Sequence, residues 1–471
     1  MPSEHPTTTN TTTDTAFSTL PLPPEQLDNL VQLGYSAMTP IQAQSLPPIL
    51  AGRDLIAQAK TGSGKTTAFG LGLLNRLNPA RWVVQALVIC PTRELAEQVA
   101  AALRRLARPI GNVKVLTLTG GATARPQIES LAHGAHIIVG TPGRLIDLTD
   151  REILDLSAVH TLVLDEADRM VDMGFFNDVL HLARLCPAER QTLLFSATFP
   201  ETIERDTDTL LRNPERVQVD TQHSQGQIEQ RFYVVENEDK PGVVMRLLAH
   251  LRPASALVFC TTRAQCADLA AHLRERGFSA LALHGDMDQR QRDDVLMQFT
   301  HQSCAVLVAT DVAARGLDIP ALDAVINVDL ARDPNVHTHR IGRTGRMDAR
   351  GLAITLCTAH ERPLADTLEH ATGQTLAWHR ISELPSGRLS PLQAPMVTLL
   401  ILGGKKAKLR PGDILGALTG DGGLTREQIG KITVTDQVSY VALDRTIAHS
   451  AFRHLSTIAF KGKPQRMKLL R

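Results

Sequence analysis

The chain alternates between short apolar runs and longer segments in which apolar residues recur with helical spacing. In its first half the apolar runs lie at 54–58, 86–90, 113–117, 137–139, 161–165 and 192–196. These runs are mostly apolar and do not alternate regularly with polar residues, which is typical of parallel strands buried on both faces, whereas 68–77, 95–106 and 178–185 carry helical patterns. This alternation predicts a doubly wound α/β domain over residues 17–216.

The same alternation returns after a polar stretch at 217–226, which we interpret as a linker. Apolar runs recur at 255–260, 280–283, 305–309, 324–327 and 352–356. They predict a second α/β domain over residues 227–380, and a stretch rich in Pro, Ser and Gly at 381–394 predicts a second linker.

The two ends of the chain differ from this pattern. Residues 1–16 are polar and rich in Thr, which predicts a disordered tail. Residues 395–471 indicate the order β (396–402), α (413–418), β (429–435), β (438–443), α (447–455), β (466–470). That order predicts a small α+β domain built as a split βαβ sandwich.

Composition narrows the class of protein. The chain is 43% apolar and 21% charged, as expected of a soluble protein, and no stretch approaches the ~20 apolar residues of a membrane span. It shows no secretory pattern, and its six cysteines have no metal-ligand spacing, so we expect a cytoplasmic protein with reduced thiols and no membrane partner.

The net charge of +1 hides an asymmetry. Residues 395–471 hold 13 Lys and Arg against 5 Asp and Glu, a net of +8, and the rest of the chain holds 37 against 44. This excess predicts that the end of the chain binds a polyanion.

Residues 59–66, Ala-Lys-Thr-Gly-Ser-Gly-Lys-Thr, lie between a predicted strand and a predicted helix. This layout is typical of a phosphate-binding loop, in which backbone N–H groups surround the phosphates, Lys65 reaches the terminal ones and Thr66 ligates Mg²⁺. The alternative for this motif alone is a glycine turn with a solvated lysine. The predicted nucleotide contacts of the loop are Thr61, Gly62, Ser63, Gly64, Lys65 and Thr66.

An acidic pair, Asp165 and Glu166, ends a buried strand one hundred residues after Lys65. At the carboxyl end of a parallel strand, Asp165 would hold Mg²⁺ and Glu166 would orient or deprotonate the attacking water. The alternative is a pair of helix-capping acids.

Taken in order, the motifs resemble those of the DEAD-box RNA helicases of superfamily 2. The resemblance covers residues 17–346 and rests on Gly34-Tyr35, Thr39–Gln42, Ala59–Thr66, Pro91–Ala96, Gly120-Gly121, Thr141–Arg144, Asp165–Asp168, Ser196–Thr198, Ala309–Asp318 and His339–Arg346. It implies two RecA-like domains and an RNA-dependent ATPase that separates short duplexes without translocating.

The resemblance also assigns roles to single residues. Gln42 would read adenine, because an amide donates and accepts at once, and Phe17 would stack on the base, which implies ATP. Asp311 would contact the ribose, and Arg343 and Arg346 would act as arginine fingers on the γ-phosphoryl group. The residues expected to couple ATP to RNA are Asp168, Ser196, Thr198 and His339. The residues expected to contact the RNA backbone are Thr92, Arg93, Gly121, Thr141, Gly143, Arg144, Thr262, Arg292, Thr310 and Gly316.

The basic end has the order of elements of an RNA-recognition motif, with Tyr440 as the one aromatic on its third strand. Tyr440 is equally compatible with a core position. The predicted RNA contacts here are Lys405, Lys406, Lys408, Arg410, Tyr440, Lys461 and Lys463. A bacterial group of the family carries a similar module, which implies as partners a large-subunit ribosomal RNA hairpin with adjacent duplex and pre-50S particles, with no small-molecule substrate other than ATP.

Two other hypotheses remain at this point. The chain is alternatively an ATP-gated RNA clamp that holds RNA without unwinding it, and the basic end is alternatively a protein-docking module.

Overall fold

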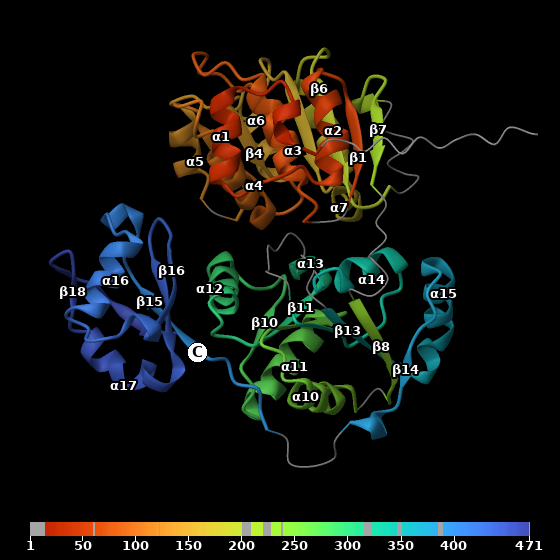
Figure 1. Ribbon diagram of the computed structural model, residues 1–471, viewed down its shortest axis with the longest axis vertical. Helices are drawn as coiled ribbons and strands as arrows, with labels where there is room; N and C mark the ends of the chain where they lie inside the picture. The colour runs from red at the N-terminus through yellow and green to blue at the C-terminus, as the bar shows by residue number, and fades with distance from the viewer. Residues whose placement is uncertain are drawn as a thin grey trace, which may run out of the picture. The chain divides into compact units, whose positions relative to one another are not determined.

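The computed structural model describes residues 15–59, 62–121, 123–199, 209–219, 228–236, 239–314, 322–345, 351–384 and 390–470. The chain divides into two compact units with a boundary after Gln222. The first unit is one α/β domain, and the second holds another α/β domain followed by a smaller α+β domain (Figure 1).

The first domain is a seven-stranded sheet with the order β3-β4-β2-β5-β6-β1-β7, and its neighbouring strands are paired in parallel. Its strands are β1 (Leu55–Gln58), β2 (Ala86–Ile89), β3 (Val115–Leu118), β4 (Ile137–Gly140), β5 (Thr161–Asp165), β6 (Gln191–Ser196) and β7 (Glu215–Gln218). Its helices are η1 (Phe17–Thr19), α1 (Pro24–Gln32), α2 (Pro40–Leu50), α3 (Lys65–Asn75), α4 (Arg93–Leu106), α5 (Arg125–Leu131), α6 (Pro142–Asp150), α7 (Ala167–Asp172) and α8 (Phe176–Leu185).

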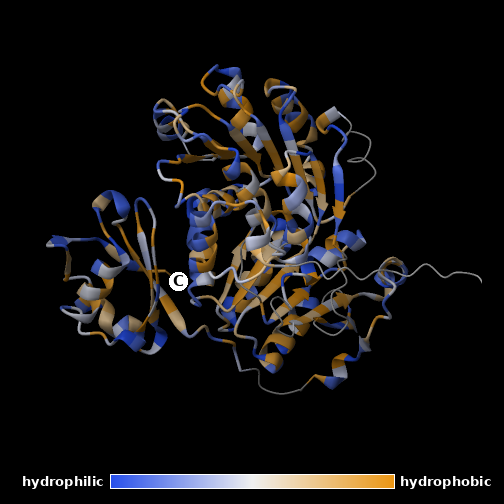
Figure 2. Cartoon of the chain, turned by 45° about the horizontal axis from the view of Figure 1, so that its top comes forward, coloured by the Kyte–Doolittle hydropathy of each residue, from blue (hydrophilic) through white to orange (hydrophobic). Residues whose placement is uncertain are grey.

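The central strands are buried at every position because both of their faces are covered by helices. β2, β5 and β6 are buried throughout, and two separate apolar clusters lie on the two sides of the sheet. Figure 2 shows the strands mostly as hydrophobic, with hydrophilic positions on the outer helix surfaces.

The second α/β domain repeats this plan with the order β10-β11-β9-β12-β13-β8-β14, again paired in parallel. Its strands are β8 (Ile228–Val234), β9 (Ala256–Cys260), β10 (Ala280–Leu283), β11 (Val306–Thr310), β12 (Ala324–Asn327), β13 (Gly351–Cys357) and β14 (Trp378–His379). Its helices are α10 (Lys240–Leu251), α11 (Arg263–Glu275), α12 (Gln289–Thr300), α13 (Asp311–Ala314), α14 (Pro334–Ile341), η3 (Ala359–Glu361), α15 (Arg362–Thr372) and η4 (Ile381–Glu383).

The third domain is an antiparallel sheet with the order β16-β17-β15-β20, which places its first and third strands in the centre. Its strands are β15 (Met396–Ile401), β16 (Ile429–Val434), β17 (Ser439–Asp444), β18 (Ala459–Phe460), β19 (Lys463–Pro464) and β20 (Met467–Leu469). Its helices are η5 (Lys405–Ala407), α16 (Pro411–Thr419), η6 (Arg426–Gln428) and α17 (Arg445–Leu455).

These observations confirm the predicted fold class, two doubly wound parallel-sheet domains and a small α+β domain. Some details differ from the prediction. Strand β7 covers the start of the predicted linker 217–226, and Leu392 and Ala394 of the predicted linker 381–394 are buried in the core of the second domain. Most of the predicted tail, and the remainder of the first linker from residue 220, lie outside the described residues.

Candidate functional site

The sheet order of the first domain gathers the predicted catalytic residues at one edge. Strands β5, β6 and β1 are parallel neighbours, so their carboxyl ends lie side by side. β5 ends at Asp165, β6 ends at Ser196, and the predicted phosphate loop follows β1. The loop is attached to β6 directly, because Ala59 N donates to Ser196 O at 3.0 Å. Parallel sheets bind ligands at this edge.

The phosphate loop has the geometry of an anion cradle. Gly62 and Gly64 have φ of 83° and 96°, and a Cβ added at Gly64 would overlap the amide of Gln42. Helix α3 begins directly after Gly64, so its N-terminal N–H groups border the loop. Ser63 Oγ is buried and has no hydrogen-bond partner among the described residues, and Lys65 Nζ donates to Ala59 O at 2.9 Å. These features fit a polyphosphate. Thr61 lies outside the described residues.

Gln42, the residue expected to read adenine, is fixed by the same loop. It is 1% exposed, its Nε2 donates to Gly64 O at 3.1 Å, and its Oε1 accepts from Thr39 N at 2.9 Å. Phe17, expected to stack on the base, is buried in the core cluster beside α2. The contact of both residues with adenine stays a prediction.

Asp165 is a buried carboxyl beside the phosphate loop. It is 3% exposed, and burial raises its pKa to about 7, while the charge of Lys65 acts in the opposite direction. Such a carboxyl favours a cationic partner that keeps it ionised, which fits the expected binding of Mg²⁺ by Asp165 and Thr66. Glu166, which follows it, is buried with a left-handed backbone (φ 55°).

The three residues expected to couple ATP to RNA in this domain form one hydrogen-bonded cluster. Asp168 Oδ2 accepts from both the N–H and the hydroxyl of Thr198, at 3.1 and 3.0 Å. Ser196 Oγ accepts from Asp168 N at 3.2 Å and donates to Thr198 O at 2.6 Å. The segment after β6 is therefore attached to the acidic motif after β5.

The RNA-contact residues predicted in this domain lie on loops and first helical turns. Thr92 caps α4 through Leu95 N, and the next residue, Arg93, reaches over Gly121, where an added Cβ would overlap its guanidinium. Arg144 donates to Gln127 at 2.8 Å. Thr141 precedes α6, and a Cβ added at Gly143 would meet nothing within 4 Å, so this turn is open to close approach.

The second α/β domain holds the remaining predicted helicase residues. Both carboxylate oxygens of Asp311 accept from Arg340 at 2.7 Å, a bidentate pair that the sequence did not indicate. Thr262 caps α11, and Arg343 is buried next to the end of α14. Thr310 ends β11, Arg292 lies on α12, and His339 lies on α14. Gly316 and Arg346 lie outside the described residues.

A buried charge network that the sequence analysis missed supports these residues. Lys240 Nζ lies 2.8 Å from Asp329 Oδ1 and 3.5 Å from Glu361 Oε2. Asp329 Oδ2 accepts from Thr261 N at 3.2 Å, and its backbone oxygen accepts from Arg340 Nη1 at 2.8 Å. Lys240, at the start of α10, therefore positions Asp329. Asp329 in turn holds Thr261, the residue before Thr262, and Arg340, the partner of Asp311. A lysine in a polar stretch gives no sequence signal of this role.

The third domain packs against the second α/β domain through one face of its sheet. Tyr440 is 3% exposed, and its hydroxyl donates to Asp294 of α12 at 2.9 Å. His301 Nε2 and the Thr433 hydroxyl are hydrogen-bonded at 2.8 Å, and the Thr398 hydroxyl donates to the Ser303 hydroxyl at 2.8 Å. Because its ring is covered, Tyr440 does not offer a stacking surface in this arrangement, and its contact with RNA stays a prediction.

The predicted basic contacts of the third domain lie away from that packed face. Lys405, Lys406 and Lys408 lie on or next to η5 and are exposed, like Arg410 before α16. Lys461 donates to Lys408 O and pairs with Asp413, each at 2.8 Å, and Lys463 is exposed on β19. The loop that carries Lys405, Lys406 and Lys408 and the β18–β19 hairpin are thus joined into one basic surface.

Comparisons with known proteins identify the class. Family models match in succession: DEAD/DEAH box helicase over residues 39–205, Helicase conserved C-terminal domain over 239–348, and DbpA RNA binding domain over 398–469. The chain belongs to the DEAD-box family of ATP-dependent RNA helicases.

Its relatives narrow the group. The ATP-dependent RNA helicase DbpA of Escherichia coli (strain K12) is 51% identical over 458 residues, which cover 97% of this chain and 100% of that protein. The helicase CshA of Geobacillus kaustophilus (strain HTA426) is 43% identical over 76% of this chain and 77% of its own length. The chain is therefore a DbpA-like helicase with an RNA-binding C-terminal domain.

A solved structure is similar to this chain over most of its length. S. cerevisiae Dbp5 bound to RNA and ADP BeF3 matches 78% of this chain and 96% of its own length, with a TM-score of 0.73 and 29% identity. No helix among the described residues combines the length and apolar character that a membrane span requires.

Proposed function

We propose that this helicase separates short RNA duplexes locally and without translocation, and that its third domain directs it to large-subunit ribosomal RNA during 50S assembly in the cytoplasm. The observation that carries the targeting proposal is the placement of the basic surface. Its exposed lysines belong to a domain that is packed on the second α/β domain, not held by a free linker. A bound RNA hairpin would therefore bring adjacent duplex to a core whose backbone contacts carry no sequence information.

The predicted residues divide the chemistry between two domains. Lys65 and the loop N–H groups would hold the phosphates, and Glu166 would orient the attacking water. Mg²⁺ held by Thr66 and Asp165 would neutralise phosphate charge. Arg343 and Arg346 would stabilise the transferring phosphoryl group once RNA favours closure of the second domain, which makes hydrolysis RNA-stimulated. An Arg343→Ala chain that keeps full RNA-stimulated hydrolysis would contradict this assignment.

Targeting is tested in the full chain, because deletion of the third domain would expose the apolar surface beneath Tyr440. A triple variant, Lys405, Lys406 and Lys408 to Gln, is compared with a control in which Arg426 and Arg453, exposed elsewhere on the same domain, become Gln. The readout is ATP hydrolysis against concentration for a ribosomal hairpin with adjacent duplex and for an unrelated structured RNA. We expect the triple variant to lose the preference for the ribosomal RNA and the control to keep it. An unchanged preference in the triple variant would favour a protein-docking role for this domain.

Unwinding is tested by strand displacement from a short duplex at saturating ATP. Release of one strand supports the proposal. Stable complexes without release would favour the ATP-gated clamp.

A further inference from the structure

A cavity of about 480 Å³ lies where α12 of the second α/β domain meets β20 of the third domain. Its wall includes apolar side chains from both domains, Leu281, Val295 and Leu470 among them, together with Met287 of the loop before α12. The volume is within the range of small-molecule pockets, about 300–1,000 Å³. Packing of the third domain completes this cavity, because Lys468 and Leu470 supply one of its sides.

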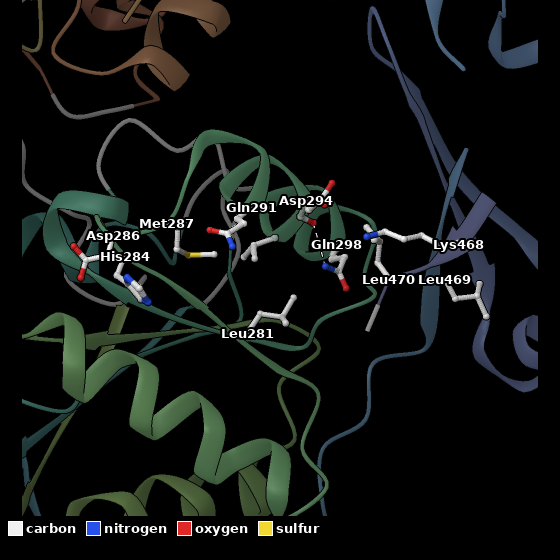
Figure 3. A pocket seen from close by; sticks show the side chains of 11 residues that line it. Leu281, His284, Asp286, Met287, Gln291, Asp294, Gln298, Lys468, Leu469 and Leu470 are labelled. Carbon is white, nitrogen blue, oxygen red and sulfur yellow. Dashed lines mark hydrogen bonds between the residues drawn. The ribbon is translucent and has the colours of Figure 1, made fainter. Parts of the chain in front are cut away.

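Polar groups share this wall with the apolar side chains. Gln298 and Asp294 lie on α12, and Lys468 extends from β20 towards that helix (Figure 3). His284 also lines the cavity. Gln298, Asp294 and Lys468 offer hydrogen-bond donors and acceptors to a ligand with a polar edge. Apolar faces with polar groups at the edge suit a flat heterocycle.

The cavity adjoins the expected path of the RNA. Arg292, a predicted RNA contact, lies on α12 next to Gln291 of the cavity wall. Asp286 of the same wall pairs with Arg263, the residue that follows Thr262. Two predicted RNA contacts, Arg292 and Thr262, therefore each adjoin in sequence a residue that lines the cavity or pairs with its wall, and Lys468 offers a cation for a phosphate.

We propose that this cavity binds one unstacked nucleobase of a single-stranded RNA segment, with Lys468 on the adjoining phosphate. The proposal rests on the RNA-binding function proposed above. Proteins recognise single-stranded RNA in this way, by receiving splayed bases between side chains and bonding their polar edges. A base site formed by both domains ties RNA binding to the docked position of the third domain.

The test uses the full chain and two RNAs, a hairpin with a short single-stranded extension and the same hairpin without it. Met287→Trp fills the cavity from a partly exposed loop position, and Lys468→Gln removes the cation. Lys431→Gln, on the exposed surface of β16, is the matched control. We expect Met287→Trp and Lys468→Gln to weaken binding of the extended RNA about tenfold, as loss of one bound base implies, and to leave the hairpin unaffected. The control should bind each RNA as tightly as the wild-type chain does.

A second measurement locates the base. 2-Aminopurine is placed at each position of the extension in turn, and one position should brighten on binding to the wild-type chain but not to Met287→Trp. Equal effects of the variants on both RNAs, or no brightened position, would overturn the proposal. If the wild-type chain binds neither RNA and its ATP hydrolysis ignores them, the proposed function itself fails. If it binds both and Met287→Trp matches it, only the base site fails.

Discussion

Replacing Lys240 by methionine tests the buried charge network of the second α/β domain. The lysine side chain is 4% exposed, and its ammonium group pairs with Asp329 at 2.8 Å and with Glu361 at 3.5 Å. Burial raises the pKa of Asp329, but the hydrogen bond and charge of Lys240, together with hydrogen bonds from Gln265 and Thr261, lower that pKa overall. Removing one partner of a buried pair leaves the other charge uncompensated, which costs about 3–5 kcal/mol. At about 2–4 °C per kcal/mol, the melting midpoint of this domain should fall by roughly 6–20 °C.

Differential scanning calorimetry of the full chain measures this change. The control is the double variant Lys240→Met, Asp329→Asn, in which the nearer of the two unpaired charges is removed and the amide oxygen still accepts from Thr261 N. The melting midpoint of the double variant should fall by less than the sum of the falls in the two single variants. We also expect the RNA concentration that half-saturates ATP hydrolysis to rise, because Thr261 precedes the predicted RNA contact Thr262. A Lys240→Met chain with the same melting midpoint as the wild-type chain would refute the reasoning.

Two further predictions follow from buried groups. Thr198→Val removes the hydroxyl bond to Asp168 but keeps the backbone bond, so we expect a loss of about 1.5–3 kcal/mol at this contact and fewer duplexes separated per ATP hydrolysed. Equal yields per ATP would contradict the coupling role. Burial lowers the pKa of His301 and of His337 to about 4, so both stay neutral in the folded chain while the unfolded chain takes up protons below about 6.5. Each histidine therefore contributes up to about 3 kcal/mol to the free energy of unfolding above pH 6.5, and this contribution is lost between pH 6.5 and 4. The free energy of unfolding of His301→Asn and of His337→Asn, measured with urea, should depend less on pH in that window than that of the wild-type chain.

The sequence predicted the strands with mainly apolar runs, the edge strands β3 and β10 among them, and missed the more polar strands β7 and β8. β2, β5 and β6 lie within a residue of their predicted ranges, because two covered faces require continuous apolarity. β7, with the sequence Glu-Arg-Val-Gln, is an edge strand with only Val217 buried, so its composition resembles a linker. Polar edge strands lack the pattern on which the prediction depends.

The motifs located the candidate site but not its supports. The family resemblance assigns one role to Asp168, Ser196 and Thr198, and the structure brings them into hydrogen-bonding distance. The contacts of Tyr440 with Asp294 and of Lys240 with Asp329 join residues 146 and 89 positions apart. Neither pair belongs to a local pattern, so only the packing of the folded chain reveals them.

Gln42 and the phosphate loop form one unit, although the sequence presents them as separate motifs. The Gly64 carbonyl accepts from Nε2 of Gln42, and the Thr39 N–H donates to Oε1 of Gln42. These two hydrogen bonds fix the orientation of the Gln42 side-chain amide. The hydroxyl of Thr39 in turn donates to Ser63 O at 2.7 Å. A fixed donor beside a fixed acceptor matches the N6/N7 edge of adenine and not the two acceptors of guanine. The backbone of the phosphate loop therefore orients the group predicted to select the base, and any change that moves Gly64 should weaken base selection and phosphate binding together.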